Sequence, residues 1–342
     1  MFFMPAVYGY DSASRTQVIS FLSDGGVVLA IWWLESLRSG RKSLYLQHPS
    51  ILALTGQLIG LGVVAPLYAF LYLTASPSSS YSLPSTTTPV LPALILGYYI
   101  PTLLTFFSPD LPDRQAFLSI WQLFPVYISL AYHTIASLST TPKDDVISTR
   151  PPSSNASTAS DSDSEPELDS DGAPPLPSLA KLNRDVLLMR ITIGVPTLLG
   201  ALSWMFTLIQ ARGEITRIFI PSGTPSSGLP SLTAFSAQFL RWDWVSVFGA
   251  MALWMGWVYV SEGSGVQPQG YLPRVLKGGS AAVGWAGMLT AAGGIGLGFG
   301  PGAMLGVGWW WREEVRAAEL EKTVLKREVQ RKVDALLRAN GA

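Results

Sequence analysis

The sequence predicts an all-α integral membrane protein, a polytopic bundle of about seven transmembrane helices with an acidic insertion. Of its 342 residues, 48% are hydrophobic and only 13% are charged, whereas soluble globular proteins carry about 25% charged residues. The mean hydropathy is +0.31, and several apolar runs reach the roughly 20 residues that a helix needs to cross a bilayer. These observations favour a membrane protein over a soluble one.

The first predicted span covers residues 16–40 and carries two carboxylates, Asp24 and Glu35. They are eleven residues apart, about three helical turns, so they share one face of the helix. A carboxylate inside a span is costly, tends to face the bundle interior and is a candidate functional group. No basic segment or small-residue cleavage pattern precedes this run, so we interpret it as a retained span rather than a signal peptide.

The other spans follow in chain order and end in a charged tail. They are predicted over residues 50–74, 90–107, 116–138, 185–209, 242–260 and 278–311. Pro66 is expected to kink the second span. The last run is too long for one straight helix and rich in glycine, so it is either one broken helix or a helical hairpin. Three tryptophans at its end are typical of the membrane interface.

Residues 140–183 differ in kind from the spans. Acids, serine and proline dominate this segment and large apolar residues are scarce, so it is predicted to be a disordered linker. It divides the chain into spans one to four (1–139), spans five to seven (184–311) and a charged helical tail (312–342). The positive-inside rule with seven spans puts the tail in the cytoplasm and the linker in the lumen. A hairpin in the last run would move the tail to the other side. Asn155 in the linker begins a possible N-glycosylation sequon, and the endoplasmic reticulum is the expected location.

The composition excludes several classes of site. The chain has no cysteine, which excludes disulfides, thiolate metal sites and a cysteine nucleophile. Two histidines are too few for a histidine-based metal centre, and no metal or cofactor is predicted. The formal net charge is zero, and no basic run with interleaved aromatic residues points to nucleic acid.

Two acids define the candidate catalytic site. In the seven-span order, Glu35 ends span one and Asp243 begins span six on the same side of the membrane. A buried carboxylic acid can donate a proton, and aromatic faces stabilise a developing cation. This combination suits carbocation chemistry on an apolar substrate. The side chains predicted to line the substrate pocket are Gln57, Trp121, Gln122 and Trp242.

Each of these residues also has a structural interpretation. Glu35 and Arg38 have the i,i+3 spacing of a helical ion pair. Asp243 suits the N-cap of the sixth span. Asp24 and Arg190 lie at comparable depths and could form a buried pair, and the two glutamines could bridge helices.

Six motifs, taken in order, resemble those of the fungal membrane-bound terpene cyclases of the ascofuranone and indole-diterpene type. They are WWLESLRSGRK (32–42), GQLIGLGVVAPLY (56–68), VLPALILGYYIPTLL (90–104), IWQLFP (120–125), FLRWDW (239–244) and GPGAMLGVGWWWREE (300–314). The acidic linker is a departure from this pattern. The resemblance implies a metal-independent cyclase of secondary metabolism that protonates an epoxide or alkene of a prenylated substrate. An epoxidase or prenyltransferase would be its pathway partner.

The spans contain no aspartate-rich motif for diphosphate and Mg²⁺, which fits protonation rather than ionisation as the initiating step. The alternative is a non-catalytic membrane protein, either a scaffold that uses the charged tail or a small transporter. A transporter should carry internal repeats, and we find none in the sequence.

Overall fold

The computed structural model describes residues 12–38, 44–74, 88–139, 179–211, 215–221, 232–263 and 281–339. All regular elements in these ranges are helical, which confirms the predicted all-α class. In chain order they are α2 (Ser12–Ser36), α3 (Leu44–Gln47), α4 (Pro49–Ile59), α5 (Leu61–Thr74), α6 (Val90–Leu94), the π-helical turn η1 (Ile95–Tyr99), α7 (Ile100–Phe107), α8 (Leu111–Trp121), α9 (Phe124–Ser139), α10 (Leu179–Ala211), α11 (Ile215–Phe219), α12 (Leu232–Gly263), α14 (Ala281–Phe299) and α15 (Pro301–Ala339).

Three helices of the described part are long and apolar enough to cross a membrane. They cover Ser14–Ser36, Val90–Phe107 and Leu179–Ala211, and shorter apolar helices accompany them. Large apolar side chains such as Leu58, Leu130 and Leu253 are exposed on the outer helices, as expected for surfaces that face lipid. The fold thus fits a membrane protein, and a total of seven spans stays a prediction.

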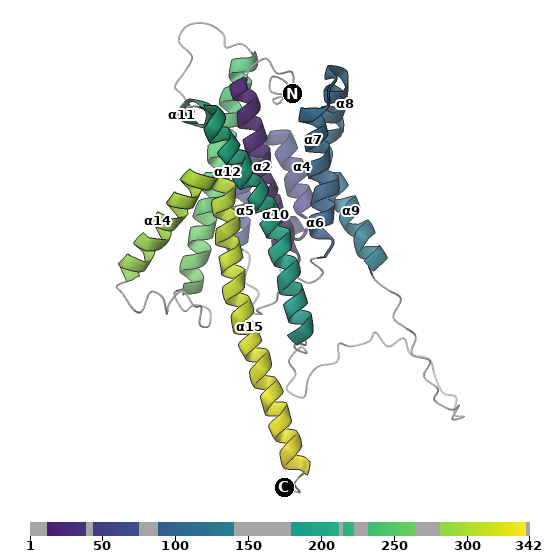
Figure 1. Cartoon of the computed structure of the whole chain (residues 1–342), viewed down its shortest axis with the longest axis vertical. Coiled ribbons are helices and arrows are strands. Elements are labelled where there is room, and N and C mark those ends of the chain that lie inside the picture. The colour runs from purple at the N-terminus through teal and green to yellow at the C-terminus, as the bar shows by residue number, and fades with distance from the viewer. Residues whose placement is uncertain are drawn as a thin grey trace, which may run out of the picture.

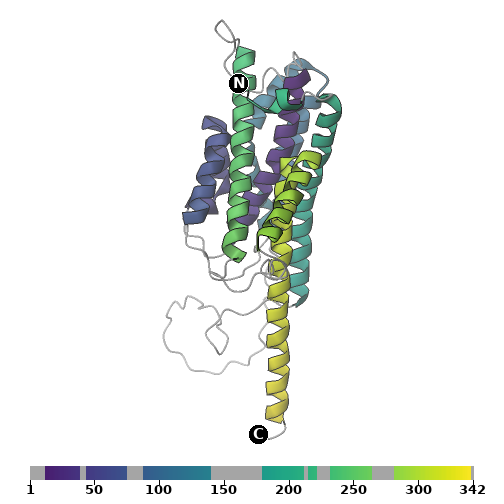
Figure 2. The same ribbon diagram turned by 90° about the vertical axis from the view of Figure 1, so that its left-hand side faces the viewer.

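Helix α2 is the centre of the bundle. Its membrane-length window is 89% buried, against 39% for each of the other two candidate spans. It contacts α4, α6, α10, α12 and α15, and both views show it enclosed by these helices (Figures 1 and 2). A helix that is apolar on all sides is expected to be buried in this way.

The second predicted span is broken in the middle. Helix α4 ends at Ile59, and Gly60 takes a φ of 98°, a conformation that glycine adopts without steric cost. Helix α5 starts at Leu61 and contains Pro66 in its interior. The break in this span therefore lies at Gly60, six residues before the proline that was expected to kink it.

The last apolar run is a hairpin, one of the two predicted alternatives. Helix α14 ends at Phe299, Gly300 has a φ of 93°, and α15 begins at Pro301. Trp204 of α10 donates its indole N–H to the carbonyl of Leu297 at 3.0 Å and so holds the hairpin against the bundle. The tail is not a separate helix, because α15 continues to Ala339 and extends beyond the other helices (Figure 1).

The hairpin changes the predicted topology. The C-terminal end of α9, the N-terminal end of α10 and the C-terminal end of α15 all point toward the same end of the bundle (Figure 1). The two helix ends that flank residues 140–178 therefore lie on the side of the tail, whereas the seven-span order put the linker and the tail on opposite sides. The predicted linker was also too long, since α10 already begins at Leu179; Asn155 lies outside the described residues.

Candidate functional site

A cavity of about 280 Å³ lies beside α2, between α4, α5, η1, the α8–α9 turn and α12. Most of its wall is apolar, with residues from Phe21 to Trp32 of α2 forming one side. Pockets that are mainly apolar, with a few polar groups, are the usual form of a small-molecule site. The polar side chains in the wall, besides tryptophan, are Gln57, Tyr98, Gln122 and Asp243.

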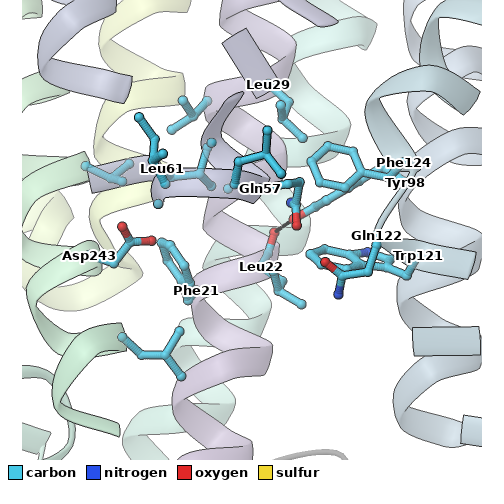
Figure 3. A pocket seen from close by; sticks show the side chains of 18 of the residues that line it. Phe21, Leu22, Leu29, Gln57, Leu61, Tyr98, Trp121, Gln122, Phe124 and Asp243 are labelled. Atoms are coloured by element: carbon cyan, nitrogen blue, oxygen red, sulfur yellow. Dashed lines mark hydrogen bonds between the residues drawn. The ribbon is translucent and has the colours of Figure 1, made fainter. Parts of the chain in front are cut away.

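The cavity has an acidic end and an aromatic end (Figure 3). Asp243 lies at one end beside Phe21 and Leu61, and the opposite end is formed by Tyr98, Trp121 and Phe124. The ring centroids of Tyr98 and Phe124 are 4.9 Å apart, and those of Trp121 and Phe124 are 5.1 Å apart. These rings present π faces that can stabilise positive charge.

Hydrogen bonds fix the rings at the aromatic end. The Tyr98 hydroxyl donates to the carbonyl of Leu22 at 2.7 Å, and the Trp121 indole N–H donates to Thr102 Oγ1 at 2.9 Å. Gln57 lies between the two ends (Figure 3). Of the predicted pocket residues, Gln57, Trp121 and Gln122 therefore do line one cavity with Asp243.

Asp243 is not the N-cap of its own helix, because α12 already starts at Leu232. Its side chain is instead directed at the first turn of α5, where the backbone N–H of Gly62 donates to Oδ1 at 2.5 Å. Only 8% of the residue is exposed. The acid is thus held at the cavity wall by a helix from another part of the chain.

Glu35 lies outside the cavity lining, in a buried network of charges. Its Oε1 accepts hydrogen bonds from Trp309 Nε1 at 2.9 Å and Arg312 Nη1 at 2.7 Å. Its Oε2 accepts from Arg38 Nε and from the Tyr72 hydroxyl, both at 3.0 Å. The predicted i,i+3 pair with Arg38 is confirmed. A carboxylate with four donors, two of them guanidinium groups, is arranged as an acceptor rather than as a proton donor.

The same network joins three helices. Arg38 Nη2 lies 2.6 Å from Glu313 Oε1, and Arg316 lies 3.3 Å from the same oxygen. With Glu35 and Arg312, these side chains connect α2 to α15, while Tyr72 brings in α5. The expectation that Glu35 and Asp243 line one pocket is therefore wrong: Trp32, one turn before Glu35, is the last α2 side chain at the cavity.

Trp242 also lies outside the cavity. Its side chain is 57% exposed and is absent from the lining, although its neighbour Asp243 is part of it. Consecutive residues of a helix point about 100° apart. Only one of the two can therefore face the interior, and the interior position belongs to the acid.

The predicted pair of Asp24 and Arg190 does not form. Arg190 makes a two-pronged ion pair with Glu314, at 2.6 and 2.7 Å. Asp24 is fully buried and packs between Gly200 of α10 and Gly302 of α15. A Cβ at either glycine would lie within 2.9 Å of Asp24 Oδ1, so the two glycines make room for this carboxyl group.

Sequence reasoning missed several residues of both sites. Tyr98 lies within an apolar run and was not among the predicted pocket residues. Trp309 and Arg312, two partners of Glu35, lie near the other end of the chain. A signal was present in the charged residues that directly follow the three tryptophans of α15, Arg312 and Glu313. Charges so close to an apolar run need partners. Glu35 of the first span could have been predicted as the partner of Arg312.

Comparison with known proteins finds similar proteins for the first half of the chain. Residues 1–163 match the family model described as the CtvD domain. Over 149 residues the chain is 31% identical to terpene cyclase ascI of Acremonium egyptiacum, covering 40% of this chain and 39% of that protein. It is 24% identical to terpene cyclase ctvD of Aspergillus terreus over 144 residues, 38% of this chain and 40% of that one.

A longer match reaches nearly the whole chain. FAD-dependent monooxygenase verC1 of Penicillium polonicum is 27% identical over 339 residues, 95% of this chain but only 36% of that protein. The chain thus spans a third to two fifths of the length of these relatives. No solved structure matches it. The CtvD match covers every helix around the cavity except α12, which carries Asp243.

Proposed function

We propose that the chain is a membrane-bound terpene cyclase, because residues 1–163 match the CtvD domain and are similar to two fungal terpene cyclases. Its substrate is a prenylated and epoxidised small molecule, and cyclisation begins with protonation by Asp243. The observation that carries the proposal is the position of this acid at one end of an apolar cavity whose other end is aromatic.

The chemistry follows from these positions. Asp243 donates its proton to the epoxide oxygen, one epoxide C–O bond breaks, and the π electrons of a neighbouring alkene attack the electron-poor carbon. Each ring closure forms one C–C bond and moves the cation along the chain toward Tyr98, Trp121 and Phe124. The last cation loses a proton to a solvent water and so gives an alkene, the epoxide oxygen remains as a hydroxyl group, and solvent returns a proton to Asp243. Substrate and product then have the same formula.

Two glutamines suit the polar head of such a substrate. Gln57 and Gln122 are both partly exposed at the cavity wall, and an amide can donate to and accept from a hydroxyl or carbonyl group. Leu58, beside Gln57 in the lining, is 80% exposed. This side of the cavity would admit an apolar substrate from the bilayer, and a multi-pass position in the endoplasmic reticulum fits that route.

The monooxygenase relative supports an oxidised substrate. Its name describes FAD-dependent oxygenation, and it contains a region similar to almost this whole chain. We propose that a flavin monooxygenase supplies the epoxide and that a prenyltransferase acts before it. Glu35 is proposed to support the site through the fold, since its network lies one turn beyond the cavity.

The test is product formation in microsomes that express the protein and receive epoxidised prenyl-phenol and prenyl-indole substrates. Asp243→Asn should lower the rate of an isomeric, cyclised product by about 10²-fold or more, the range for loss of general acid catalysis. Leu253→Ala, at an exposed position of the same helix, serves as the control and should keep the rate. A product that has gained oxygen would favour a monooxygenase, and full activity of the Asp243 variant would remove this acid from the mechanism.

A further inference from the structure

We propose that Gly60 and Gly62 are positioning residues that present Asp243 to the substrate. This inference rests on the proposed function, because it assigns a purpose to the break between α4 and α5. The break brings the first turn of α5 against α12 at the level of the acid. Gly60 lines the cavity, and Gly62 lies just behind the lining residue Leu61. The two glycines contribute backbone groups and space rather than side chains.

The backbone of α5 holds the carboxyl group. The first N–H groups of a helix have no partner within it, and they attract negative charge. In this structure Gly62 donates its N–H to Asp243 Oδ1 at 2.5 Å, and the N–H of Leu61 also faces the carboxyl group. This contact fixes Oδ1, so that the transferable proton resides on Oδ2. The acid is thereby oriented by a backbone group that has no other hydrogen-bonding function in α5.

The space around the acid admits no side chain at either glycine. A Cβ at Gly62 would lie 2.8 Å from Oδ1 of Asp243, 3.0 Å from its Cα and 3.0 Å from Ser246 Cβ. A Cβ at Gly60 would lie 2.9 Å from the same oxygen and 3.1 Å from Phe239. Because Cα belongs to the backbone of α12, it cannot move aside without separating the two helices.

Gly60 is also fixed by its conformation. Its φ of 98° ends α4, and its N–H donates to the carbonyl of Gly56 at 2.9 Å. A residue with a side chain would be strained at this angle. The sequence Gly60-Leu61-Gly62 therefore combines a turn that starts α5 with an opening that receives the carboxyl group.

The matched control lies on the helix that carries the acid. A Cβ at Gly256 of α12 would meet nothing within 4 Å. Gly256→Ala thus makes the same chemical change as Gly62→Ala in open space. Any general effect of placing alanine at a glycine in this bundle is removed by comparing the two variants.

The first readout is kinetic. We expect Gly62→Ala to lower kcat by about 10–100-fold with KM changed less than threefold, because displacing a reacting group by about 1 Å can cost 10²-fold in rate. Gly256→Ala should leave kcat and KM unchanged, and a wild-type kcat for Gly62→Ala would overturn the inference.

The second readout needs no turnover. Gly62→Ala should lower the melting temperature of the purified protein by roughly 3–10 °C. The loss should be smaller in an Asp243→Ala background, where the carboxyl group is gone and the contacts with Cα of residue 243 and with Ser246 remain. Equal losses in the two backgrounds would overturn the proposed contact. If wild type forms no cyclised product from any substrate while this coupling is present, the proposed function fails and the positioning of Asp243 by Gly62 stands.

Discussion

Replacing Glu35 by glutamine should destabilise the fold rather than remove a reacting group. The side chain of Arg312 is 1% exposed and lies 2.7 Å from Glu35, while its other carboxylate, Glu313, is 3.6 Å away. The substitution removes one charge from a buried pair and directs amide N–H groups at existing donors. Breaking a buried pair on one side costs about 3–5 kcal/mol. We therefore expect Glu35→Gln to lower the free energy of unfolding by about 3 kcal/mol or more.

The measurement is a double-mutant cycle on thermal stability in detergent. Glu35→Gln and Arg312→Gln are each expected to be strongly destabilising, and the double variant should recover about 1–3 kcal/mol relative to their sum, as for directly interacting groups. The control is Glu319→Gln. Its ion pair with Lys322 is 3.1 Å long and the two side chains are 31% and 48% exposed, so its loss should cost less than about 1 kcal/mol.

The result that would refute this reasoning is specific. If Glu35→Gln keeps the melting temperature of wild type but loses cyclised product by 10²-fold or more, Glu35 takes part in the chemistry directly. The network would then have to open during turnover to bring this acid to the substrate. Parallel loss of stability and activity, with partial recovery of both in the double variant, is the outcome that we expect.

Three further predictions concern packing, a surface pair and the tail. Gly302→Ala should lower the free energy of unfolding by about 1–3 kcal/mol through overpacking, because a Cβ there would collide with Asp24 Oδ1. Thermal denaturation measures this loss, with Gly256→Ala as the control. Arg190→Ala should cost at most about 1 kcal/mol in the same assay, since this side chain is 44% exposed, and a larger loss would contradict a surface role. Deleting residues 325–342 should leave product formation unchanged, whereas a scaffold would lose its function with the tail.

The helical class and the membrane character follow from composition and run length, which local sequence determines. The ends of the helices were harder to predict. Gly60 and Gly300 divide apolar runs that are continuous in composition, and the decision between a break and a continuous helix depends on what packs against each glycine. At Gly300 this neighbour is Trp204, on another helix.

The candidate site was predictable in part, from residues on three different helical segments that were expected at similar depths of the bundle. Asp243, Gln57 and Gln122 were expected to meet at one site, and they line one cavity. Glu35 and Trp242 were expected there too, and both lie elsewhere. A charge in an apolar run indicates that a partner is needed, but the sequence does not identify every partner. For Glu35, Arg38 is local, whereas Arg312 is 277 residues away.

That separation has a consequence for how the protein is made. At about 5–20 residues per second, the ribosome needs roughly 15–55 s to synthesise the chain between Glu35 and Arg312, which are 277 residues apart. During this interval α2, the most enclosed of the three candidate spans, lacks its contacts with α15. Arg38, three residues on, can neutralise Glu35 meanwhile, since their contact at 3.0 Å is local. The central helix of the bundle is therefore synthesised early and completed last, and a chain that stops before α15 leaves the Glu35 carboxylate without Trp309 and Arg312.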